Sequence, residues 1–175
     1  MIINGKMLVI FFGKTGAGKD YTAEILAKEF GFYHYDADSD LTAEMREAIT
    51  NGLVFGDAMR SKYLEIVIEK THKLLNVNLK VALTQGLFKN KHRWELMKAF
   101  PLAIFIWVDA DDNTIEQRIL ERSSMVTLEY AHRINPLFET PDFRCEKIIN
   151  NGGLEKLLND VKKIGMKLED MIKLI

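Results

Sequence analysis

The chain has 175 residues, 47% hydrophobic and 28% charged, which is ordinary for a globular protein with one core. Its formal net charge of −1 gives no general attraction for nucleic acid or an acidic membrane surface, so we expect neither as a partner. The single cysteine, Cys145, excludes an internal disulfide and fits a reducing compartment, and the apolar run at 7–12 is too short to span a membrane. We therefore expect one cytoplasmic domain over residues 1–175.

Five apolar segments alternate with helical patterns along the chain. The first, KMLVIFF, is almost continuously apolar, which is typical of a central parallel strand covered on both faces. LAIFIWVDA is the most hydrophobic segment of all. This alternation predicts an α/β fold in which helices flank a parallel sheet of five strands. The predicted strands cover residues 6–12, 32–36, 79–86, 102–110 and 146–150.

Helical spacing and end signals predict the segments between these strands. Gly31 is placed to end the first helix, and Asn51-Gly52 closes the second, which begins with acidic residues. The stretch 123–142 holds two of the three prolines and no clear core pattern, so we expect a mobile lid there. The predicted helices cover residues 20–31, 38–52, 57–75, 89–100, 111–124 and 152–175.

The stretch GKTGAGKD lies between the first strand and the first helix and matches the phosphate-binding pattern G-x-x-x-x-G-K-[ST] except at its last position. The glycines permit a tight turn whose backbone N–H groups point inward, and the following helix offers its positive end to an anion. A lysine here places a charge on the β- and γ-phosphates. The predicted nucleotide ligands are Gly13, Lys14, Thr15, Gly16, Ala17, Gly18, Lys19 and Asp20.

Asp20 stands where the pattern has a Ser or Thr hydroxyl for magnesium. A carboxylate there can bind a hard cation directly or through water, but it repels phosphates unless the cation lies between them. We therefore predict that Asp20 is a metal ligand and that nucleotide binding depends strongly on divalent metal. The alternative is that Asp20 only caps the helix and metal is held elsewhere. The third strand, LKVALTQG, has no acid that would orient magnesium.

Several further segments resemble P-loop small-molecule kinases, particularly gluconate kinases and shikimate kinases. Asp36-Ala37-Asp38 is similar to an Asp-Gly-Asp motif of gluconate kinases, and NGLVFGDAMR is similar to a later segment that ends in Arg60. FIWVDADDNTIEQRILER resembles their fourth strand and the helix bearing Arg118 and Arg122. The tail EKIINNGGLEKLLNDV resembles the purine-binding turn of dephospho-coenzyme A kinases and nucleoside monophosphate kinases.

The resemblance implies a three-layer P-loop kinase fold with a short lid. It implies transfer of the γ-phosphoryl group of ATP, with Mg²⁺ bridging the phosphates, to a hydroxyl of a gluconate-like or shikimate-like acid. Asp38 is the candidate for the base that orients the acceptor hydroxyl, or for a residue that supports magnesium without touching it. The alternative is that Asp36 and Asp38 are only acids that begin a helix. The implied catalytic residues are Lys19, Asp38 and Arg122, the implied nucleotide ligands beyond the loop are Arg118, Asn151 and Gly152, and the implied acceptor ligands are Asp36, Asp38, Arg60, Lys91 and Arg133.

Two other functions stay open on the sequence. The tail and the Gly-Lys-Asp ending favour a nucleoside or deoxynucleoside monophosphate kinase, whereas Asp20 and the missing acid of the third strand favour a nucleotide-binding module without catalysis. The acceptor is a small molecule in both enzyme interpretations. Hydrophobic helix faces are explained equally well by a core or by a homodimer surface.

Overall fold

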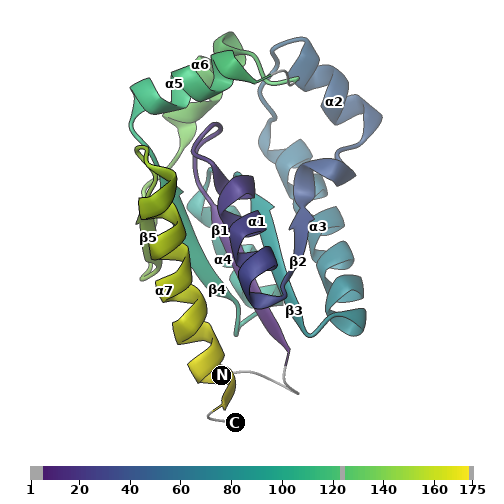
Figure 1. Cartoon of the computed structure of the whole chain (residues 1–175). Helices are drawn as coiled ribbons and strands as arrows, with labels where there is room; N and C mark the ends of the chain where they lie inside the picture. The colour runs from purple at the N-terminus through teal and green to yellow at the C-terminus, as the bar shows by residue number, and fades with distance from the viewer. Residues whose placement is uncertain (1–5, 123–124, 174–175) are drawn as a thin grey trace.

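The computed structural model describes residues 6–122 and 125–173 and confirms the predicted α/β class (Figure 1). Its strands form one parallel sheet in the order β2-β3-β1-β4-β5. The most apolar strands, β1 and β4, pair with each other inside the sheet, as their hydrophobicity predicts. The strands are β1 (Met7–Phe12), β2 (Tyr33–Asp36), β3 (Lys80–Gln85), β4 (Ile104–Asp109) and β5 (Glu146–Ile149).

Helices connect consecutive strands, as parallel pairing requires. Two of the connections also contain a short 3-10 helix. The helices are α1 (Lys19–Phe30), η1 (Ala37–Asp40), α2 (Ala43–Thr50), α3 (Asp57–Val77), α4 (Asn90–Ala99), α5 (Asp112–Glu121), α6 (Leu128–Ile134), η2 (Asn135–Leu137) and α7 (Leu154–Lys173).

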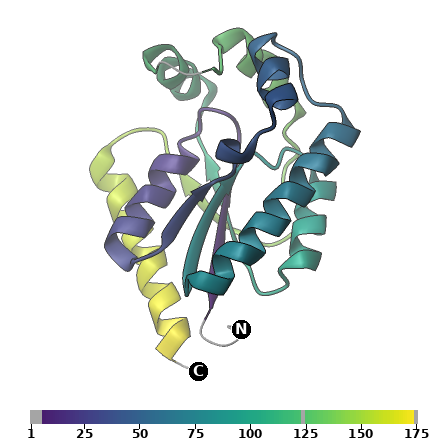
Figure 2. The same cartoon turned by 90° about the vertical axis from the view of Figure 1, so that its right-hand side faces the viewer.

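The sheet is covered on both faces because β1 is apolar on both sides. Val9 and Phe11 pack into a cluster with residues of α1 and α7, whereas Ile10 and Phe12 pack with α2, α3, α4 and α6. These four side chains of β1 are fully buried. The result is three layers, with β1 at the centre (Figures 1 and 2). In the described part of the chain, no helix has both the length and the hydropathy that a membrane span requires.

The carboxyl ends of the strands meet at one edge of the sheet, and α2, α5 and α6 lie beyond that edge (Figures 1 and 2). Open α/β sheets bind their ligands outside this edge. The loop after β1 and the turns after β2 and β3 all emerge there. The fold therefore gathers the predicted site segments at one end of the molecule.

The structure corrects the prediction of one continuous helix over residues 38–52. Two capping side chains divide this segment. Asp36 accepts a hydrogen bond from the backbone N–H of Asp38 and so begins η1, whereas Thr42 accepts one from Met45 and begins α2. The break separates the acids of η1 from α2.

The expected lid over residues 123–142 is more regular than its sequence indicates. It contains α6 and η2, and three side chains of α6, Tyr130, Ala131 and Ile134, are buried. The prediction missed this helix because a seven-residue helix with three buried positions has too few turns to give a clear period. Ser123 and Ser124, at the start of the expected lid, lie outside the described residues.

Candidate functional site

The loop after β1 has the geometry of a phosphate-binding turn. Gly18 is the N-cap of α1 and has φ 91° and ψ 28°, a left-handed conformation that suits glycine. At Gly13 a Cβ atom would lie 2.1 Å from the carbonyl oxygen of Val108. The first N–H groups of α1, which follow this turn directly, have no partner within the helix and suit an anion. Lys19 turns back over this loop, where its Nζ donates to the carbonyl oxygen of Lys14 at 3.2 Å.

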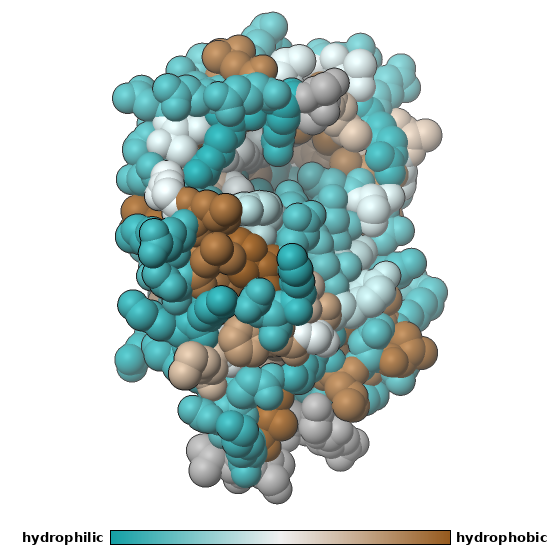
Figure 3. Space-filling model, in the orientation of Figure 1, coloured by the Kyte–Doolittle hydropathy of each residue, from teal (hydrophilic) through white to brown (hydrophobic). Residues whose placement is uncertain are grey.

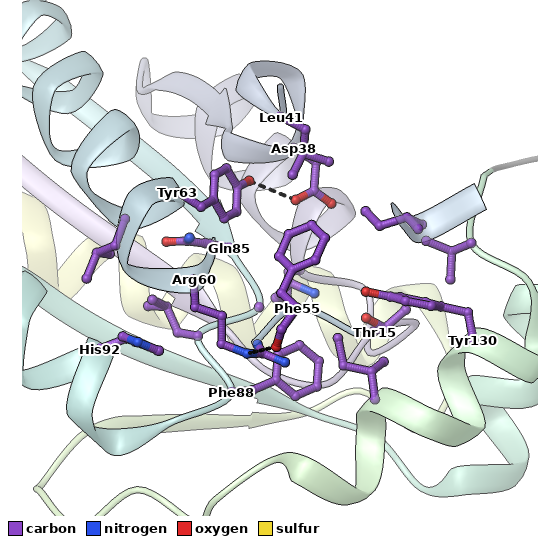
Figure 4. A pocket seen from close by; sticks show the side chains of 17 residues that line it. Thr15, Asp38, Leu41, Phe55, Arg60, Tyr63, Gln85, Phe88, His92 and Tyr130 are labelled. Atoms are coloured by element: carbon purple, nitrogen blue, oxygen red, sulfur yellow. Dashed lines mark hydrogen bonds between the residues drawn. The ribbon is translucent and has the colours of Figure 1, made fainter. Parts of the chain in front are cut away.

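A cavity of about 100 Å³ opens beside the loop (Figure 4). We call it the acceptor cavity. Figure 3 shows a recess at this end of the surface. Ten of its seventeen lining residues are Leu, Ile, Val, Phe or Tyr, and the polar side chains are few. The polar lining residues are Thr15, Lys19, Asp38, Arg60, Gln85 and His92, contributed by the loop, the turn after β2, α3, β3 and α4.

Asp38 projects into the acceptor cavity from η1. The hydroxyl of Tyr63 on α3 donates to its Oδ1 at 3.0 Å (Figure 4). Burial, followed by the charge of Asp38, raises the pKa of Tyr63 above its ordinary value, so the phenol stays protonated and stays a donor. Tyr63 therefore fixes one oxygen of the Asp38 carboxylate.

Three buried polar atoms on the acceptor cavity wall have no hydrogen-bond partner in the described structure. They are Arg60 Nη2, Gln85 Oε1 and His92 Nε2, and Figure 4 shows all three side chains on the wall. Gln85 and His92 are 7% and 4% exposed, so bulk water does not reach them freely. Leaving such atoms unpaired destabilises the fold, commonly by about 1–3 kcal/mol each. Unpaired groups that share one cavity indicate a ligand that completes them.

Burial sets the charge of this polar wall. It lowers the pKa of His92 below its ordinary value, so the imidazole is neutral near pH 7. Burial also lowers the pKa of Arg60, but a guanidinium stays charged in proteins. The Nε of Arg60 donates to the carbonyl oxygen of Phe55 at 2.9 Å, and its carbon Cζ lies 5.7 Å from the centre of the Phe88 ring. Arg60 therefore gives the acceptor cavity a positive charge without a carboxylate partner among the described residues.

Asp20 is held by the sheet and does not cap its helix. The N-cap of α1 is Gly18, and no side chain makes the cap hydrogen bond there. The hydroxyl of Thr84 on β3 instead donates to Asp20 Oδ1 at 2.5 Å. His34 Nε2 lies 3.3 Å from the same hydroxyl and 3.9 Å from Asp20 Oδ1. The carboxylate thus lies between the loop and the ends of β2 and β3.

Asp36 lies near this carboxylate. In the sheet its register partner is Thr84. Burial, then the charges of Asp20 and Asp38, raise the pKa of Asp36 above its ordinary value. The charges of Asp20 and Asp38 therefore disfavour the ionised form of Asp36 beside the phosphate loop, and a nearby cation would relieve that repulsion.

A second cavity of about 330 Å³ lies on the other side of the loop, beside α7. Its lining includes Gly18, Arg118, Asn150 and Gly152. Arg118 donates to the carbonyl oxygen of Ala17 at 3.3 Å and to Asn150 Oδ1 at 3.1 Å. This cavity joins the predicted purine turn to the phosphate loop, and Figure 3 shows hydrophobic surface on this side of the molecule.

Outside the phosphate loop, and in addition to Asp36, four of the predicted ligands line neither cavity. Lys91 is exposed, and His92 reaches the acceptor cavity in its place because consecutive helical residues point in different directions. Arg122 is exposed at the end of α5. Arg133 donates to the carbonyl oxygen of Gly52 and pairs with Glu129, and Asn151 accepts from the backbone N–H of Asp111. These residues reach a ligand only if the segments that carry them move.

Among the described residues of the expected lid, Asn135 makes side-chain hydrogen bonds to the loop. Asn135 Oδ1 accepts from the backbone N–H of Thr15 at 2.9 Å, and Asn135 Nδ2 donates to the carbonyl oxygen of Thr15 at 3.1 Å. One of the inward N–H groups of the loop is therefore occupied by the lid. We call this pair of bonds the Asn135 latch.

Sequence reasoning missed three residues that shape the site, Tyr63, Thr84 and Gln85. From the basic residues at 89–93, which it offered as an acceptor lining, it chose Lys91 and not His92. Tyr63 and Thr84 carry no signal beyond an apolar helix stripe and a strand. Gln85 does carry a sequence signal, because a polar side chain at the carboxyl end of a central strand is expected to face a ligand. His92 could be separated from its basic neighbours only by knowing which face of α4 is buried.

The family model for shikimate kinase matches residues 15–142, which is more than half of the chain. Solved structures are similar in fold at low identity. An unliganded sugar kinase from Janibacter sp. HTCC2649 is 19% identical with a TM-score of 0.79, over 90% of this chain and 93% of that one. A gluconokinase from Sinorhizobium meliloti 1021 is 16% identical with a TM-score of 0.76, over 97% and 99%.

A third similar structure is the Mycobacterium tuberculosis APS kinase, solved in complex with AMPPNP and APS. It is 16% identical to this chain, with a TM-score of 0.67, over 94% of this chain and 98% of that one. At these identities the structural matches show the shared fold. The three-layer P-loop kinase architecture predicted from the sequence is thereby confirmed.

Proposed function

We propose that this chain, which belongs to the shikimate kinase family of P-loop small-molecule kinases, transfers the γ-phosphoryl group of ATP to a hydroxyl of a small anionic metabolite. Membership of this family supports a kinase reaction but does not identify the acceptor. The acceptor and the residues that act on it are proposed from the geometry of the site.

One observation carries the proposal: the acceptor cavity contains both the phosphate-loop lysine and a fixed carboxylate. Lys19 and Thr15 line it on the loop side, and Asp38 lines it from η1. Phosphoryl transfer requires positioning and charge neutralisation more than covalent chemistry. A cavity that joins a phosphate cradle to a held carboxylate meets both needs.

The polar wall supports an anionic acceptor that is cyclic or otherwise compact. Arg60 supplies an unpaired positive charge, and Gln85 Oε1 accepts a hydrogen from the acceptor. The apolar remainder of the lining is unsuited to an open-chain polyol, because each buried hydroxyl needs a partner. We therefore favour a shikimate-like acid over a gluconate-like one.

In this proposal Asp38 orients the acceptor hydroxyl and accepts its proton as the hydroxyl oxygen bonds to the γ-phosphorus. The bond between the γ-phosphorus and the oxygen that bridges to the β-phosphate breaks, and ADP leaves. Tyr63 keeps the carboxylate in place through its hydrogen bond. Lys19 and the N–H groups of the loop stabilise the charge on the phosphates. Arg122 and Arg133 join the site only on closure of the lid, which would also exclude water.

The residues present fit magnesium. Hard cations prefer oxygen ligands, and Mg²⁺ is commonly held by one or two carboxylates together with substrate phosphates. Asp20 and Asp36 supply carboxylates next to the loop. The described residues contain no cluster of three or more His, Cys, Asp or Glu that would form an all-protein site. When bound, the ion would neutralise phosphate charge.

The second cavity supports adenine binding. Arg118, Asn150 and Gly152 lie behind the loop, where the purine of a nucleotide held by its phosphates would reach. Asn151 is the neighbouring residue that the sequence predicted.

A deoxynucleoside monophosphate is the second candidate acceptor. The aromatic side chains Phe55, Tyr63, Phe88 and Tyr130 on the cavity wall favour it, because a planar base packs well between rings. Gln85 could then bind the edge of the base.

Three sequence predictions stay predictions. They are a single domain over residues 1–175 with a lid at about 123–142, a cytoplasmic location and the choice between monomer and homodimer.

The test is ADP formation from MgATP with a panel of acceptors: cyclic hydroxy acids, open-chain sugar acids and deoxynucleoside monophosphates. We expect acceptor-dependent turnover with the first class, abolished in Lys19→Ala. Turnover only with deoxynucleotides would select the second candidate. Tight ATP binding without turnover on any class would contradict an enzyme and favour the nucleotide-binding module.

A further inference from the structure

His92 is a buried histidine on the wall of the acceptor cavity, and it has no part in the phosphoryl transfer described above. Its side chain comes from α4 and is 4% exposed (Figure 4). In the described part of the chain, its Nε2 atom has no hydrogen-bond partner. A buried ring nitrogen without a partner lowers stability, and its place on a cavity wall indicates that a ligand atom completes it.

The three unpaired atoms of this wall differ in what they can bind. Arg60 Nη2 only donates a hydrogen, Gln85 Oε1 only accepts one, and an imidazole nitrogen such as that of His92 does either, according to whether it carries a proton. A carboxylate has only acceptor oxygens, so it fits Arg60 and a protonated nitrogen of His92. A hydroxyl of the acceptor, which can donate, fits Gln85 instead. The pattern therefore favours an acceptor whose carboxylate lies at Arg60 and His92.

Without a ligand, the surroundings of His92 keep its imidazole neutral. Burial is the main cause of its lowered pKa. On its own helix, Glu95 acts to raise this pKa and Lys91 to lower it, and on α3 the charge of Arg60 lowers it while that of Asp57 raises it. An anion bound at Arg60 would offset the positive charge of that guanidinium and favour the protonated imidazole. The other ionisable side chains that line the cavity are Lys19, Asp38, Tyr63 and Tyr130.

We propose that His92 is a specificity-determining residue of the acceptor cavity: together with Arg60 it binds the carboxylate of the acceptor, and it takes up a proton from solvent as the acceptor binds. The inference rests on the proposed function, since it requires an anionic acceptor. Binding then raises the pKa of His92, so the gain in affinity is fully present below the pKa of the free chain and is lost as the pH rises through the pKa of the complex. If His92 only fills the buried face of α4, binding takes up no proton.

The experiment titrates shikimate into the native chain by calorimetry, in two buffers that differ in ionisation enthalpy. The difference between the two observed enthalpies gives the number of protons taken up, without any turnover. We expect net proton uptake and a dissociation constant that falls by about 10-fold between about pH 8 and about pH 6, since one unit of pKa shift corresponds to that factor. The methyl ester of shikimate, which lacks the charge, should bind more weakly and without proton uptake.

His92→Gln is the decisive variant, because its amide keeps a hydrogen-bond donor but does not titrate. Its affinity for shikimate should not change with pH, so it should bind about 10-fold more weakly than the native chain at about pH 6. His72→Gln is the matched control and should keep the native pH dependence, since His72 is exposed on α3 and packs against Phe100 without lining the cavity. The comparison of shikimate with its ester holds even if His92→Gln fails to fold. Binding of shikimate to the native chain without proton uptake, or a native pH dependence in His92→Gln, would overturn the proposal.

Turnover separates this inference from the proposed function. If an acid of the panel is phosphorylated but binds without proton uptake, the kinase reaction stands and only the role of His92 is contradicted. If the panel selects an acid other than shikimate, that acid and its methyl ester take the place of shikimate in the titration. If no acid of the panel binds or is phosphorylated, the proposed function is contradicted, and the role of His92 is contradicted with it.

Discussion

The two sides of the acceptor cavity are built in opposite ways. On the phosphate side, one continuous segment supplies the loop, and its side chains are already engaged: Lys14 with Asp112, Lys19 with a loop carbonyl and Asp20 with Thr84. On the acceptor side, residues from α3, β3 and α4 meet, and three of the four buried unpartnered side-chain atoms of the described structure lie there.

The phosphate side is therefore complete as folded, whereas the acceptor side is completed by its ligand. An unpaired buried polar atom lowers stability, so its presence in a folded site indicates that it serves binding. Variants on the two sides should therefore differ in which property they change.

Lys19→Ala tests the phosphate side. Removing the positive charge of Lys19 should lower turnover by about 1,000-fold, since loss of a single preorganised donor in an active site commonly has an effect of that size. Steady-state ADP formation measures it. Lys28→Ala, an exposed position at the far end of α1, is the control and should behave as the native chain. Equal turnover in the two variants would contradict a role for Lys19 in the reaction.

Asp38→Asn tests the residue that lies between the two sides. It keeps the shape but removes the proton acceptor, so we expect kcat to fall by about 100-fold while nucleotide affinity stays native. Asp40→Asn is the control, because Asp40 lies on the same 3-10 helix and accepts from Tyr35 without lining the cavity. A lowered nucleotide affinity in Asp38→Asn would instead assign Asp38 to the metal.

Gln85→Leu tests the acceptor side, and it should improve stability while it weakens binding of the acceptor. Removing a buried unpaired acceptor should raise the free energy of unfolding by about 1 kcal/mol, and the same change should raise the KM for the acceptor by about 10-fold. Thermal melting and acceptor titration measure the two effects.

Trp107→Phe is the matched control for Gln85→Leu. The indole Nε1 of Trp107 is the fourth buried unpartnered atom, and Trp107 does not line the cavity. It should leave the KM for the acceptor unchanged, whatever its effect on stability. If both variants change KM, or neither does, the claim that the unpaired atoms of the acceptor side bind the acceptor is contradicted.

Asn135→Ala opens the latch between the lid and the loop, and its expected effect is the smallest. Freeing the N–H of Thr15 for a phosphate should lower the dissociation constant of ATP by about 2- to 5-fold, in line with the net value of one hydrogen bond. Calorimetric titration measures it. A weaker affinity would mean that the latch supports the loop in its binding conformation.

The contrast between the two sides also explains how much the sequence could predict. The loop is one segment with its strand before it and its helix after it, so local patterns place all of its residues together, and the sheet follows from apolar runs at regular spacing. Asp38 and Arg60 were found through resemblance, and the structure places both on the same cavity wall.

The acceptor side could not be predicted in the same way. Gln85 and His92 face the cavity because of the register of β3 and the buried face of α4, and both are set by tertiary packing. Among the basic residues at 89–93, Lys91 was chosen as the acceptor ligand, whereas the adjacent His92 is the one that lines the cavity. The bond between Asp20 and Thr84 joins residues far apart in the chain, and therefore no local pattern contains it.

The most direct test of the account is a phosphorus balance in one reaction: the ADP formed from MgATP compared with the phosphoryl group recovered on the acceptor by mass spectrometry. We expect one phosphorylated cyclic hydroxy acid for each ADP, and no ADP above background without acceptor. ADP that appears at the same rate with and without acceptors, accompanied by free phosphate, would contradict the central claim that the cavity delivers an acceptor to the loop.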